Sequence, residues 1–291
     1  MSAPVAALPE GRVASAPPEA RGLPRDGVRM LVASATEGLR HARAYNLPAV
    51  MRPGDLVVVN TSDTLPAALT GVTRDGERVE VHLSTPDPAA AGTPGDVLAG
   101  TRSRWVVELR RPSGRYGGEP STADRTGTRV ALAGGGRLTI DAPYPAGEGR
   151  RRLWTSELDT PAPLLPWLTD HGHPVRYGYA GAPWPLSAYR TGHADTPGSA
   201  EMPSAGRPLT ARTFRRLRAR GVRTGSVVLH CGLSSPDADE APYAEWFSVP
   251  ASTLAAVAET RVAGGRVVAV GTTVVRALES AARTGRTEGW T

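Results

Sequence analysis

The strongest constraint on the fold is an alternation of helix and strand patterns along residues 210–283. Apolar residues at helical spacing, each group closed by a glycine, predict helices over residues 210–220, 252–263 and 273–283. Short apolar runs predict strands over residues 226–231, 246–249 and 267–270. Strands that alternate with helices form a parallel sheet with crossover connections, so an α/β fold is predicted here.

A further strand of this type is predicted at residues 55–60. Its sequence, Asp-Leu-Val-Val-Val-Asn, follows an Arg-Pro-Gly turn, and such a continuous apolar run is typical of a strand buried on both faces. Residues 1–27 are rich in alanine, proline and glycine with little periodicity. We expect most of them to form a loosely ordered arm.

The middle of the chain has a different pattern. Short alternating runs bounded by glycine, proline or aspartate predict antiparallel strands over residues 78–83, 104–109, 129–132 and 137–140. A chain of 291 residues can hold one large domain or two modest ones. We therefore predict an all-β domain at residues 73–159, inserted into a discontinuous α/β domain of residues 1–72 and 160–291.

Composition excludes several chemistries. All 34 basic residues are arginine because the sequence contains no lysine, so a Schiff-base lysine, a lysine base and a phosphate-loop lysine are impossible. The single cysteine, Cys231, excludes an intramolecular disulfide and a zinc site of paired cysteines, and fits a reducing cytosol. No apolar run approaches the roughly 20 residues of a membrane span. We expect a cytoplasmic monomer without membrane contact.

Residues 266–282 contain the sharpest local motif. A buried strand ends at Val270, Gly271 permits a tight turn, and Thr272 or Thr273 can cap the following helix. Free N–H groups at such a helix start can bind an anion or a polar ligand, with Arg276 and Glu279 flanking it. The alternative interpretation is an ordinary strand-to-helix turn with a good cap.

A basic segment follows residue 206. Between Met202 and Pro236 there are seven arginines and no acidic residue. An arginine-rich helix face can meet several phosphates of a nucleic acid, and a solvated helix face explains the same pattern. The candidate RNA contacts within it are Arg212, Arg215 and Arg216.

Two further residues stand at predicted strand ends. His230 lies at the end of a predicted strand, where side chains in open α/β sheets often reach a ligand crevice. Glu245 directly precedes Trp246, and a carboxylate next to an aromatic ring is suited to holding a base or a ribose. Either can equally be structural. His171 and His173 have no further ligands that the sequence identifies, so no metal site is predicted. The glycine signatures of dinucleotide-binding proteins and serine hydrolases are absent from the sequence.

Several blocks together resemble one family. They are Arg-Pro-Gly-Asp-Leu-Val-Val-Val-Asn at 52–60, Leu-Pro-Ala at 65–67, Val-Leu-His-Cys-Gly at 228–232, Glu-Trp at 245–246, and Gly-Gly-Arg-Val-Val-Ala-Val-Gly-Thr-Thr-Val-Val-Arg at 264–276 with Leu-Glu-Ser-Ala-Ala at 278–282. In order and spacing the chain resembles a diverged member of the S-adenosylmethionine:tRNA ribosyltransferase-isomerase (QueA) family.

The resemblance implies a larger barrel-like α/β domain with a smaller β-barrel inserted. It also implies S-adenosylmethionine as co-substrate, no prosthetic group, and transfer of the ribosyl unit onto 7-aminomethyl-7-deazaguanine in tRNA during queuosine biosynthesis. His230 and Glu245 are then the candidates for proton handling. The candidate substrate-binding residues are Asn60, Gly271, Thr272, Thr273, Arg276 and Glu279.

Four positions depart from the family pattern. Asp63 and Ala68 stand where arginines are usual, and Pro208 and Tyr243 stand where histidines are usual. Two alternatives therefore remain open. One is an enzyme that uses S-adenosylmethionine on an acceptor other than tRNA, and the other is a non-catalytic RNA-binding paralogue.

Overall fold

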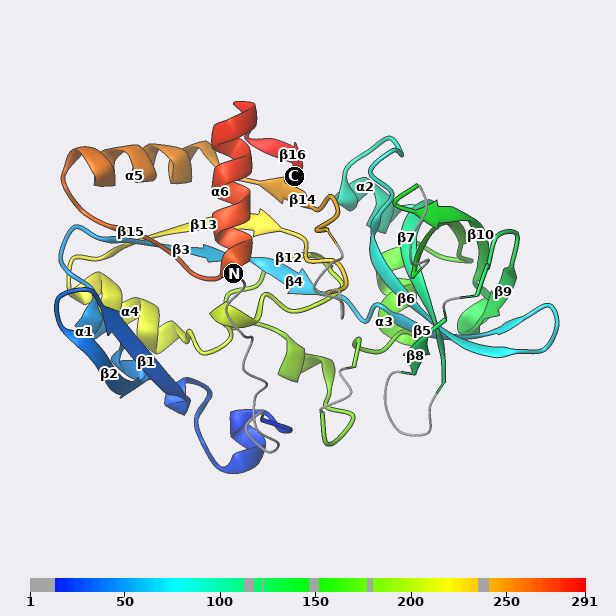
Figure 1. Ribbon diagram of the computed structural model, residues 1–291, viewed down its shortest axis with the longest axis horizontal. Helices are drawn as coiled ribbons and strands as arrows, with labels where there is room; N and C mark the ends of the chain where they lie inside the picture. The colour runs from blue at the N-terminus through cyan, green and yellow to red at the C-terminus, as the bar shows by residue number, and fades with distance from the viewer. Residues whose placement is uncertain (1–13, 113–117, 122, 147–151, 177–179, 235–240) are drawn as a thin grey trace, which may run out of the picture.

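The computed structural model describes residues 14–112, 118–121, 123–146, 152–176, 180–234 and 241–291. An α/β part and a β-barrel lie side by side (Figure 1). The sheet of the α/β part has the strand order β15-β3-β13-β14-β16. The bounds of these strands are Val267–Ala269, Leu56–Asn60, Arg223–Leu229, Trp246–Ser248 and Glu288–Trp290.

The sheet is mixed. β15, β3 and β13 run parallel, as predicted, whereas β14 pairs antiparallel with β13 and β16 antiparallel with β14. The prediction of a wholly parallel sheet was therefore wrong at β14. Parallel neighbours need a crossover connection, and the described residues between β13 and β14 contain no helix to provide one.

Helices cover both faces of this sheet. α5 (Ala251–Val262) and α6 (Thr272–Thr284) pack on one face, and α1 (Leu47–Val50) and α4 (Ala211–Ala219) pack on the other. Alternate side chains of β3 enter the two cores, since Leu56 and Val58 lie in one and Val57 and Val59 in the other. The prediction that this strand is buried on both faces is confirmed.

The second part is a closed antiparallel barrel. Six strands follow one another in the order β11-β10-β9-β5-β6-β7, and a further pairing of β11 with β7 closes the ring. Their bounds in chain order are Ala68–Thr73 (β5), Arg78–Pro86 (β6), Arg102–Arg111 (β7), Arg129–Leu132 (β9), Arg137–Tyr144 (β10) and Leu153–Asp159 (β11). The short strand β8 (Glu119–Pro120) adds to β7. The prediction of an α/β fold with a smaller all-β barrel is confirmed.

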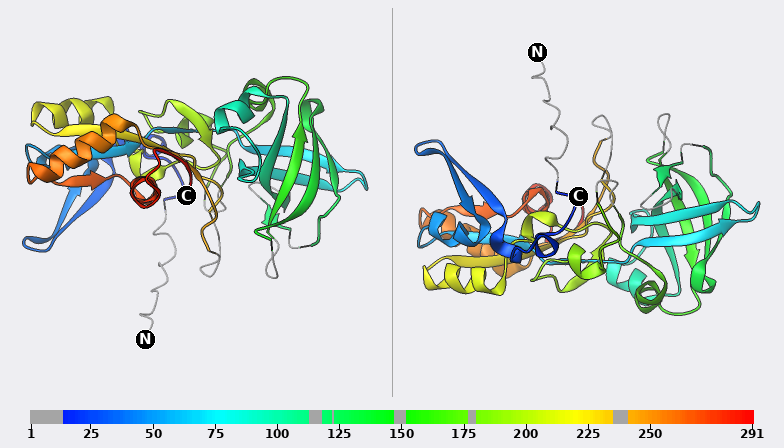
Figure 2. Two further views of the ribbon diagram at one scale, coloured as in Figure 1. Left: turned by 90° about the horizontal axis from the view of Figure 1, so that it is seen from above. Right: turned by 90° about the horizontal axis from the view of Figure 1, so that it is seen from below.

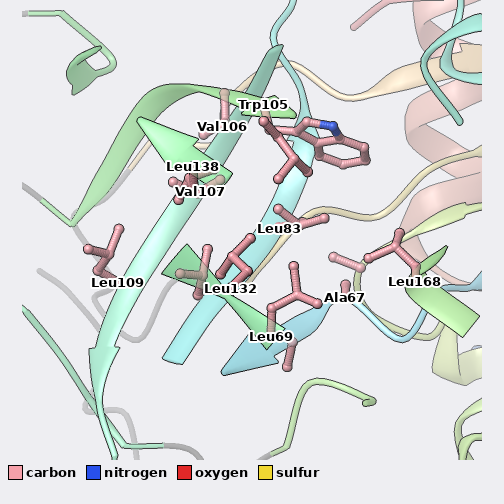
Figure 3. Close-up of a cluster of buried hydrophobic side chains, with 14 of the residues drawn as sticks. Ala67, Leu69, Leu83, Trp105, Val106, Val107, Leu109, Leu132, Leu138 and Leu168 are labelled. Atoms are coloured by element: carbon pink, nitrogen blue, oxygen red, sulfur yellow. The ribbon is translucent and has the colours of Figure 1, made fainter. Parts of the chain in front are cut away.

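The barrel is filled by apolar side chains from every wall (Figure 3). Trp105, Leu83 and Leu69 come from different strands, and Leu168 joins them from α3 (Leu164–His171). The indole N–H of Trp167 on α3 donates to the Gly134 carbonyl at 2.9 Å. This helix therefore covers one end of the barrel. A shorter helix, α2 (Pro94–Ala99), lies between β6 and β7 in sequence.

Two parallel strands connect the parts. β4 (Ser62–Thr64) leads from β3 toward the barrel and pairs with β12 (Thr196–Ser199). The first barrel strand, β5, begins at Ala68. It therefore starts before residue 73, where we expected the insertion to begin. The division into domains 1–72 with 160–291 and 73–159 stays a prediction.

The described part of the N-terminal segment is ordered, unlike the predicted arm. Two turns of 3-10 helix, Pro18–Arg21 and Arg25–Gly27, are held by Glu19, which accepts from Arg25 at 2.9 Å and from Arg207 at 3.0 Å. Residues 1–13 of the predicted arm lie outside the described residues. An antiparallel hairpin follows, formed by β1 (Arg29–Ser34) and β2 (Gly38–Arg43), which we did not predict.

Candidate active site

A cavity of about 760 Å³ lies at the carboxyl ends of the parallel strands. Crevices in open α/β sheets form at this edge because side chains and helix starts converge there. Five residues of the predicted site line the cavity: Glu245, Gly271, Thr272, Thr273 and Arg276. The cavity's other walls come from the segments 201–205, 231–234 and 241–243.

Gly271 forms the turn between β15 and α6. Its φ of +90° lies in the region that favours glycine, and a Cβ there would come within 2.9 Å of the Cβ of Ala205. Gly271 is also the N-cap of α6, and no side chain caps this helix. The prediction that Thr272 or Thr273 serves as the cap was therefore wrong. The first N–H groups of α6 remain uncapped at the cavity wall.

Asn60 supports this corner from behind. Its amide nitrogen donates to the Leu229 carbonyl at 2.8 Å and to Oγ1 of Thr273 at 3.3 Å, and its oxygen accepts from the Leu229 N–H at 3.1 Å. The side chain is buried and does not line the cavity. Asn60 thus links the end of β3 to β13 and α6.

Glu245 is the carboxylate at the centre of the site. Oε2 accepts from Nη1 of Arg276 at 2.6 Å, and Oε1 accepts from the Gly232 N–H at 2.8 Å. Burial raises the pKa of Glu245 above its ordinary value, and the Gly232 N–H and the Arg276 guanidinium only partly offset this. A carboxylate with a raised pKa is a stronger base than an ordinary glutamate, which suits it to proton transfer.

The main chain of Glu245 is held by the last residue of the sequence. The Glu245 N–H donates to Oγ1 of Thr291 at 3.1 Å, and the Thr291 N–H donates to the Glu245 carbonyl at 3.0 Å. These bonds continue the pairing of β14 with β16, in which Trp246 lies opposite Trp290. The backbone that carries the carboxylate is therefore anchored next to the end of the sheet.

His230 lies beside the cavity rather than on it. The side chain is 4% exposed, Nδ1 lies 2.7 Å from Oγ of Ser62, and the ring packs against Gly198. Burial lowers the pKa of His230 to about 4. The structure thus places this imidazole, expected to handle protons, within the wall between β13 and the β4–β12 pair.

The neighbouring residues Cys231 and Glu201 do line the cavity. Burial raises the pKa of the Cys231 thiol, as expected of a structural cysteine and not of a nucleophile. Glu201 was not identified from the sequence, and its Oε2 accepts from Oγ of Ser234 at 2.8 Å. The segment around Glu201 shows no helix or strand periodicity that would have drawn attention to it.

A hydroxyl pair joins the cavity wall to the barrel. Oγ of Ser84 on β6 lies 2.7 Å from the hydroxyl oxygen of Tyr243 and accepts from the Leu233 N–H at 3.1 Å. The Tyr243 hydroxyl donates to the Leu233 carbonyl at 2.6 Å. Burial raises the pKa of Tyr243, so this hydroxyl keeps its proton. The two residues therefore couple the barrel to the wall that carries Gly232.

Two of the positions that depart from the family pattern, Asp63 and Ala68, fit into their surroundings in different ways. Asp63 pairs with Arg190 at 3.1 Å. Ala68 is fully buried and belongs to the barrel core. Both positions are thus integrated into the surrounding structure without the arginines that the resemblance led us to expect.

Glu279 faces a second, adjoining cavity of about 510 Å³ and not the first. Arg276 and Pro242 line both cavities, so the two meet at these residues. Most of the predicted substrate-binding residues therefore line the first cavity. Glu279 lines only the second cavity, and Asn60 lies behind the wall of the first.

The candidate RNA contacts lie on α4, away from the cavity. Arg212, Arg215 and Arg216 are exposed, while Thr213 and Leu217 of the same helix are buried. Arg216 donates to the Tyr45 carbonyl at 2.8 Å. The helix thus presents a basic face to solvent, as the sequence predicts.

The described residues contain no helix long and apolar enough to span a membrane. The same part of the chain holds no group of three histidine, cysteine, aspartate or glutamate side chains placed to bind a metal ion.

Comparison with known proteins identifies the family. A family model described as "Queuosine biosynthesis protein" matches residues 6–291. The S-adenosylmethionine:tRNA ribosyltransferase-isomerase of Xylella fastidiosa (strain M12) is 33% identical over 289 residues, covering 96% of this chain and 74% of the relative. The enzyme of the same name from Sorangium cellulosum (strain So ce56) is 35% identical over 292 residues, covering 94% and 75%.

A solved structure is also similar, the S-adenosylmethionine tRNA ribosyltransferase of Thermotoga maritima. It is 24% identical, covers 92% of this chain and 70% of its own, and superposes with a TM-score of 0.37. The family match rests on the sequence comparisons, which extend over both the α/β part and the barrel. The chain belongs to the S-adenosylmethionine:tRNA ribosyltransferase-isomerase (QueA) family of queuosine biosynthesis proteins.

Proposed function

We propose that this protein transfers and isomerises the ribosyl moiety of S-adenosylmethionine onto 7-aminomethyl-7-deazaguanine in tRNA, giving epoxyqueuosine. One observation carries the proposal. A partly buried carboxylate, its arginine partner and an uncapped helix start line one cavity of about 760 Å³. This volume is in the range that encloses a small organic ligand.

The helix start suits the amino-acid end of the co-substrate. Uncapped N–H groups and the helix dipole favour a negative group, and the methionine carboxylate of S-adenosylmethionine is one. Thr272 and Thr273 stand at this point of the cavity wall. In the proposal they hold the carboxylate, with the positively charged sulfonium directed away from the positive end of the dipole.

Glu245 handles protons in the proposal. A sulfonium acidifies the adjacent C5′, so a base can remove a proton there, and the departing adenine must later receive one. The raised pKa of Glu245 makes it a stronger base than an ordinary glutamate, and the protonated carboxyl can return the proton. Arg276 holds the carboxylate in place through Nη1 and is itself fixed by the Tyr243 carbonyl at 2.6 Å. His230 has a positioning role behind the wall.

We further propose tRNA as the partner, contacted by Arg212, Arg215 and Arg216, with S-adenosylmethionine as a consumed co-substrate and no prosthetic group. The proposed location is the cytoplasm and the proposed state is a monomer. A different acceptor is the second candidate function. It is favoured by position 63. There an aspartate paired with Arg190 stands in place of the expected arginine, which could have held a phosphate.

The test is adenine release from S-adenosylmethionine in the presence of tRNA that carries the modified base. We expect release by the wild-type protein and weaker donor binding by Thr273→Val, measured by calorimetry. Thr169→Val, on the exposed side of α3, is the matched control and should bind the donor normally.

The outcomes separate the candidates. Donor binding without tRNA-dependent adenine release would favour the different acceptor. Absence of donor binding together with salt-sensitive tRNA binding would favour the non-catalytic paralogue, and it would refute the enzyme.

A further inference from the structure

The hairpin of β1 and β2 projects from the α/β part, and among the described strands it pairs with no other (Figure 2). Its base is fixed, because Nη1 of Arg43 donates to the Gly27 carbonyl at 2.8 Å and the Ala44 N–H donates to the Val28 carbonyl at 2.9 Å. An isolated two-stranded hairpin is at best marginally stable in water. The exposed part therefore gains little from packing in the free protein.

Two like charges face each other at this base. Arg29 of β1 lies directly opposite Arg43 of β2. Side chains opposite one another in an antiparallel pair lie on the same face, about 5 Å apart at Cβ, and like charges there are destabilising. In the part of the chain that the structure describes, no carboxylate pairs with either arginine. An anion bound between them would relieve the repulsion.

Apolar side chains continue the same face toward the tip. The register places Leu31 opposite His41 and Ala33 opposite Leu39. Leu31 is 56% exposed and Leu39 is 74% exposed. We call this set, Arg29, Leu31, Leu39, His41 and Arg43, the hairpin face. It combines two cations, an imidazole and uncovered apolar surface.

The segment at the base of the hairpin contacts the basic helix α4. Arg216 of α4 donates to the carbonyl of Tyr45, two residues beyond the end of β2, at 2.8 Å. Between Asp26 and Asp55 the only acidic residue is Glu37, in the turn at the hairpin tip. α4 therefore contacts the base of the hairpin, while the hairpin itself projects away from α4 (Figure 2).

We infer that the hairpin face is a second contact surface for RNA, which holds a backbone phosphate between Arg29 and Arg43 and packs ribose or base surface against Leu31 and Leu39. This inference rests on the proposed function, since tRNA supplies the polyanion. Guanidinium groups pair with phosphate oxygens in fork geometry, and phosphate contacts position an RNA without reading its sequence. The surface therefore orients tRNA rather than recognising the reacting base.

The experiment compares two arginines on one hairpin. Arg29→Ala removes a cation from the hairpin face, and Arg40→Ala removes one from the opposite face, where Arg40 lies opposite Val32. We measure the affinity for a tRNA transcript at several salt concentrations. Arg29→Ala should weaken binding roughly threefold to tenfold and reduce the salt slope by about 0.7 to 0.9, the value for one phosphate contact. Arg40→Ala should match the wild type.

The melting temperature distinguishes binding from folding. Because Arg29→Ala removes a like-charge pair, its melting temperature should equal or exceed that of the wild type. Equal tRNA affinities for the two variants would overturn the inference, as would a loss of stability that accounts for the weaker binding. Binding to anionic vesicles that depends on Arg29, with unchanged tRNA affinity, would refute RNA in favour of a membrane surface.

Failure of the hairpin inference and failure of the proposed function would give different experimental results. A wild-type protein that releases adenine from S-adenosylmethionine with tRNA, while Arg29→Ala shows unchanged tRNA affinity, refutes the hairpin face alone. A wild-type protein that neither binds tRNA nor releases adenine refutes the proposed function, and the inference with it.

Discussion

Arg276 on α6 donates a hydrogen bond of 2.6 Å to the carboxylate of Glu245, which stands immediately before β14. The guanidinium favours the charged carboxylate, but burial of the same group has the larger effect and raises its pKa. The pair therefore combines a fixed orientation with a proton affinity suited to acid–base chemistry. It also links α6 to the central sheet at the cavity.

Replacing Glu245 should slow catalysis strongly while leaving the fold intact. Glu245→Gln keeps the size of the side chain but removes its ability to take a proton, so we expect adenine release to slow by about 10²- to 10⁴-fold. Glu259→Gln is the control, because Glu259 is an exposed carboxylate that pairs with Arg223 at the opposite end of β13 from the cavity. Equal rates for both variants would refute the role of Glu245.

The link between the barrel and the cavity wall should affect substrate affinity. Ser84→Ala leaves the buried Leu233 N–H without its acceptor, which costs about 1 to 3 kcal/mol of unfolding free energy. The wall that presents Gly232 to Glu245 should loosen, so KM for S-adenosylmethionine should rise. Ser156→Ala, which removes a buried bond to the Trp105 carbonyl inside the barrel, should lower stability without changing KM. A rise in KM for both variants would contradict a specific link.

The turn at Gly271 should not accept a side chain. Gly271→Ala places a Cβ at a φ of +90° and within 2.9 Å of Ala205, so we expect a loss of about 1 to 3 kcal/mol in unfolding free energy and weaker donor binding. Combining it with Ala205→Gly removes the contact but not the unfavourable φ. Urea unfolding of both variants should show partial recovery in the double variant, and full recovery would mean that φ carries no cost.

Acid should destabilise the protein through His230. Its pKa falls from 6.5 in the unfolded chain to about 4 in the fold, so below pH 6.5 the unfolded state binds more protons and stability falls as the pH falls. The loss should be complete near pH 4 and amount to roughly 3 kcal/mol. Asp55, whose pKa is lowered to about 2 mainly by hydrogen bonds from Arg266, adds its loss only below pH 3.8.

Urea unfolding at several pH values measures this effect. Between pH 6.5 and 4 the stability of His230→Asn should depend less steeply on pH than that of the wild type. A remaining slope is expected from His193, whose pKa is also lowered by burial. An unchanged slope in His230→Asn would contradict the assignment.

The basic face of α4 should bind RNA through phosphates. Arg215→Ala is expected to weaken tRNA binding uniformly across sequences and to reduce the salt slope by about 0.7 to 0.9. Arg137→Ala removes an exposed arginine from barrel strand β10 and serves as the control. If the two variants have the same affinity and slope, α4 is a solvated helix face and not an RNA contact.

Much of the secondary structure could be predicted because its patterns are local. The apolar run of β3 and the 3.6-residue pattern of α6 lie within single short segments, so neighbouring residues specify them. The glycine that forms the corner was also predictable, since the turn needs a positive φ. The helix cap was not, because Thr273 accepts its hydrogen bond from Asn60, far away in the chain.

The site itself depends on distant residues. Ser84, Glu201 and Tyr243 have no local pattern that marks them, and each acquires its place through contacts across the fold. His230 illustrates the reverse case. Its position at a strand end suggested the crevice, but the β4–β12 pair covers it, and no periodicity in the sequence predicts that pair.

By itself, the amino-acid sequence determined the alternation of elements, the barrel strands, the family and the glycine corner, because these depend on neighbours along the chain. Tertiary structure alone decided that Glu245 pairs with Arg276 at the cavity, that His230 is enclosed, and that Arg29 lies opposite Arg43 on a projecting hairpin. The physical reason is that burial and pairing are properties of the packed fold. They raise the pKa of Glu245, and they leave Arg29 and Arg43 without a carboxylate partner among the described residues.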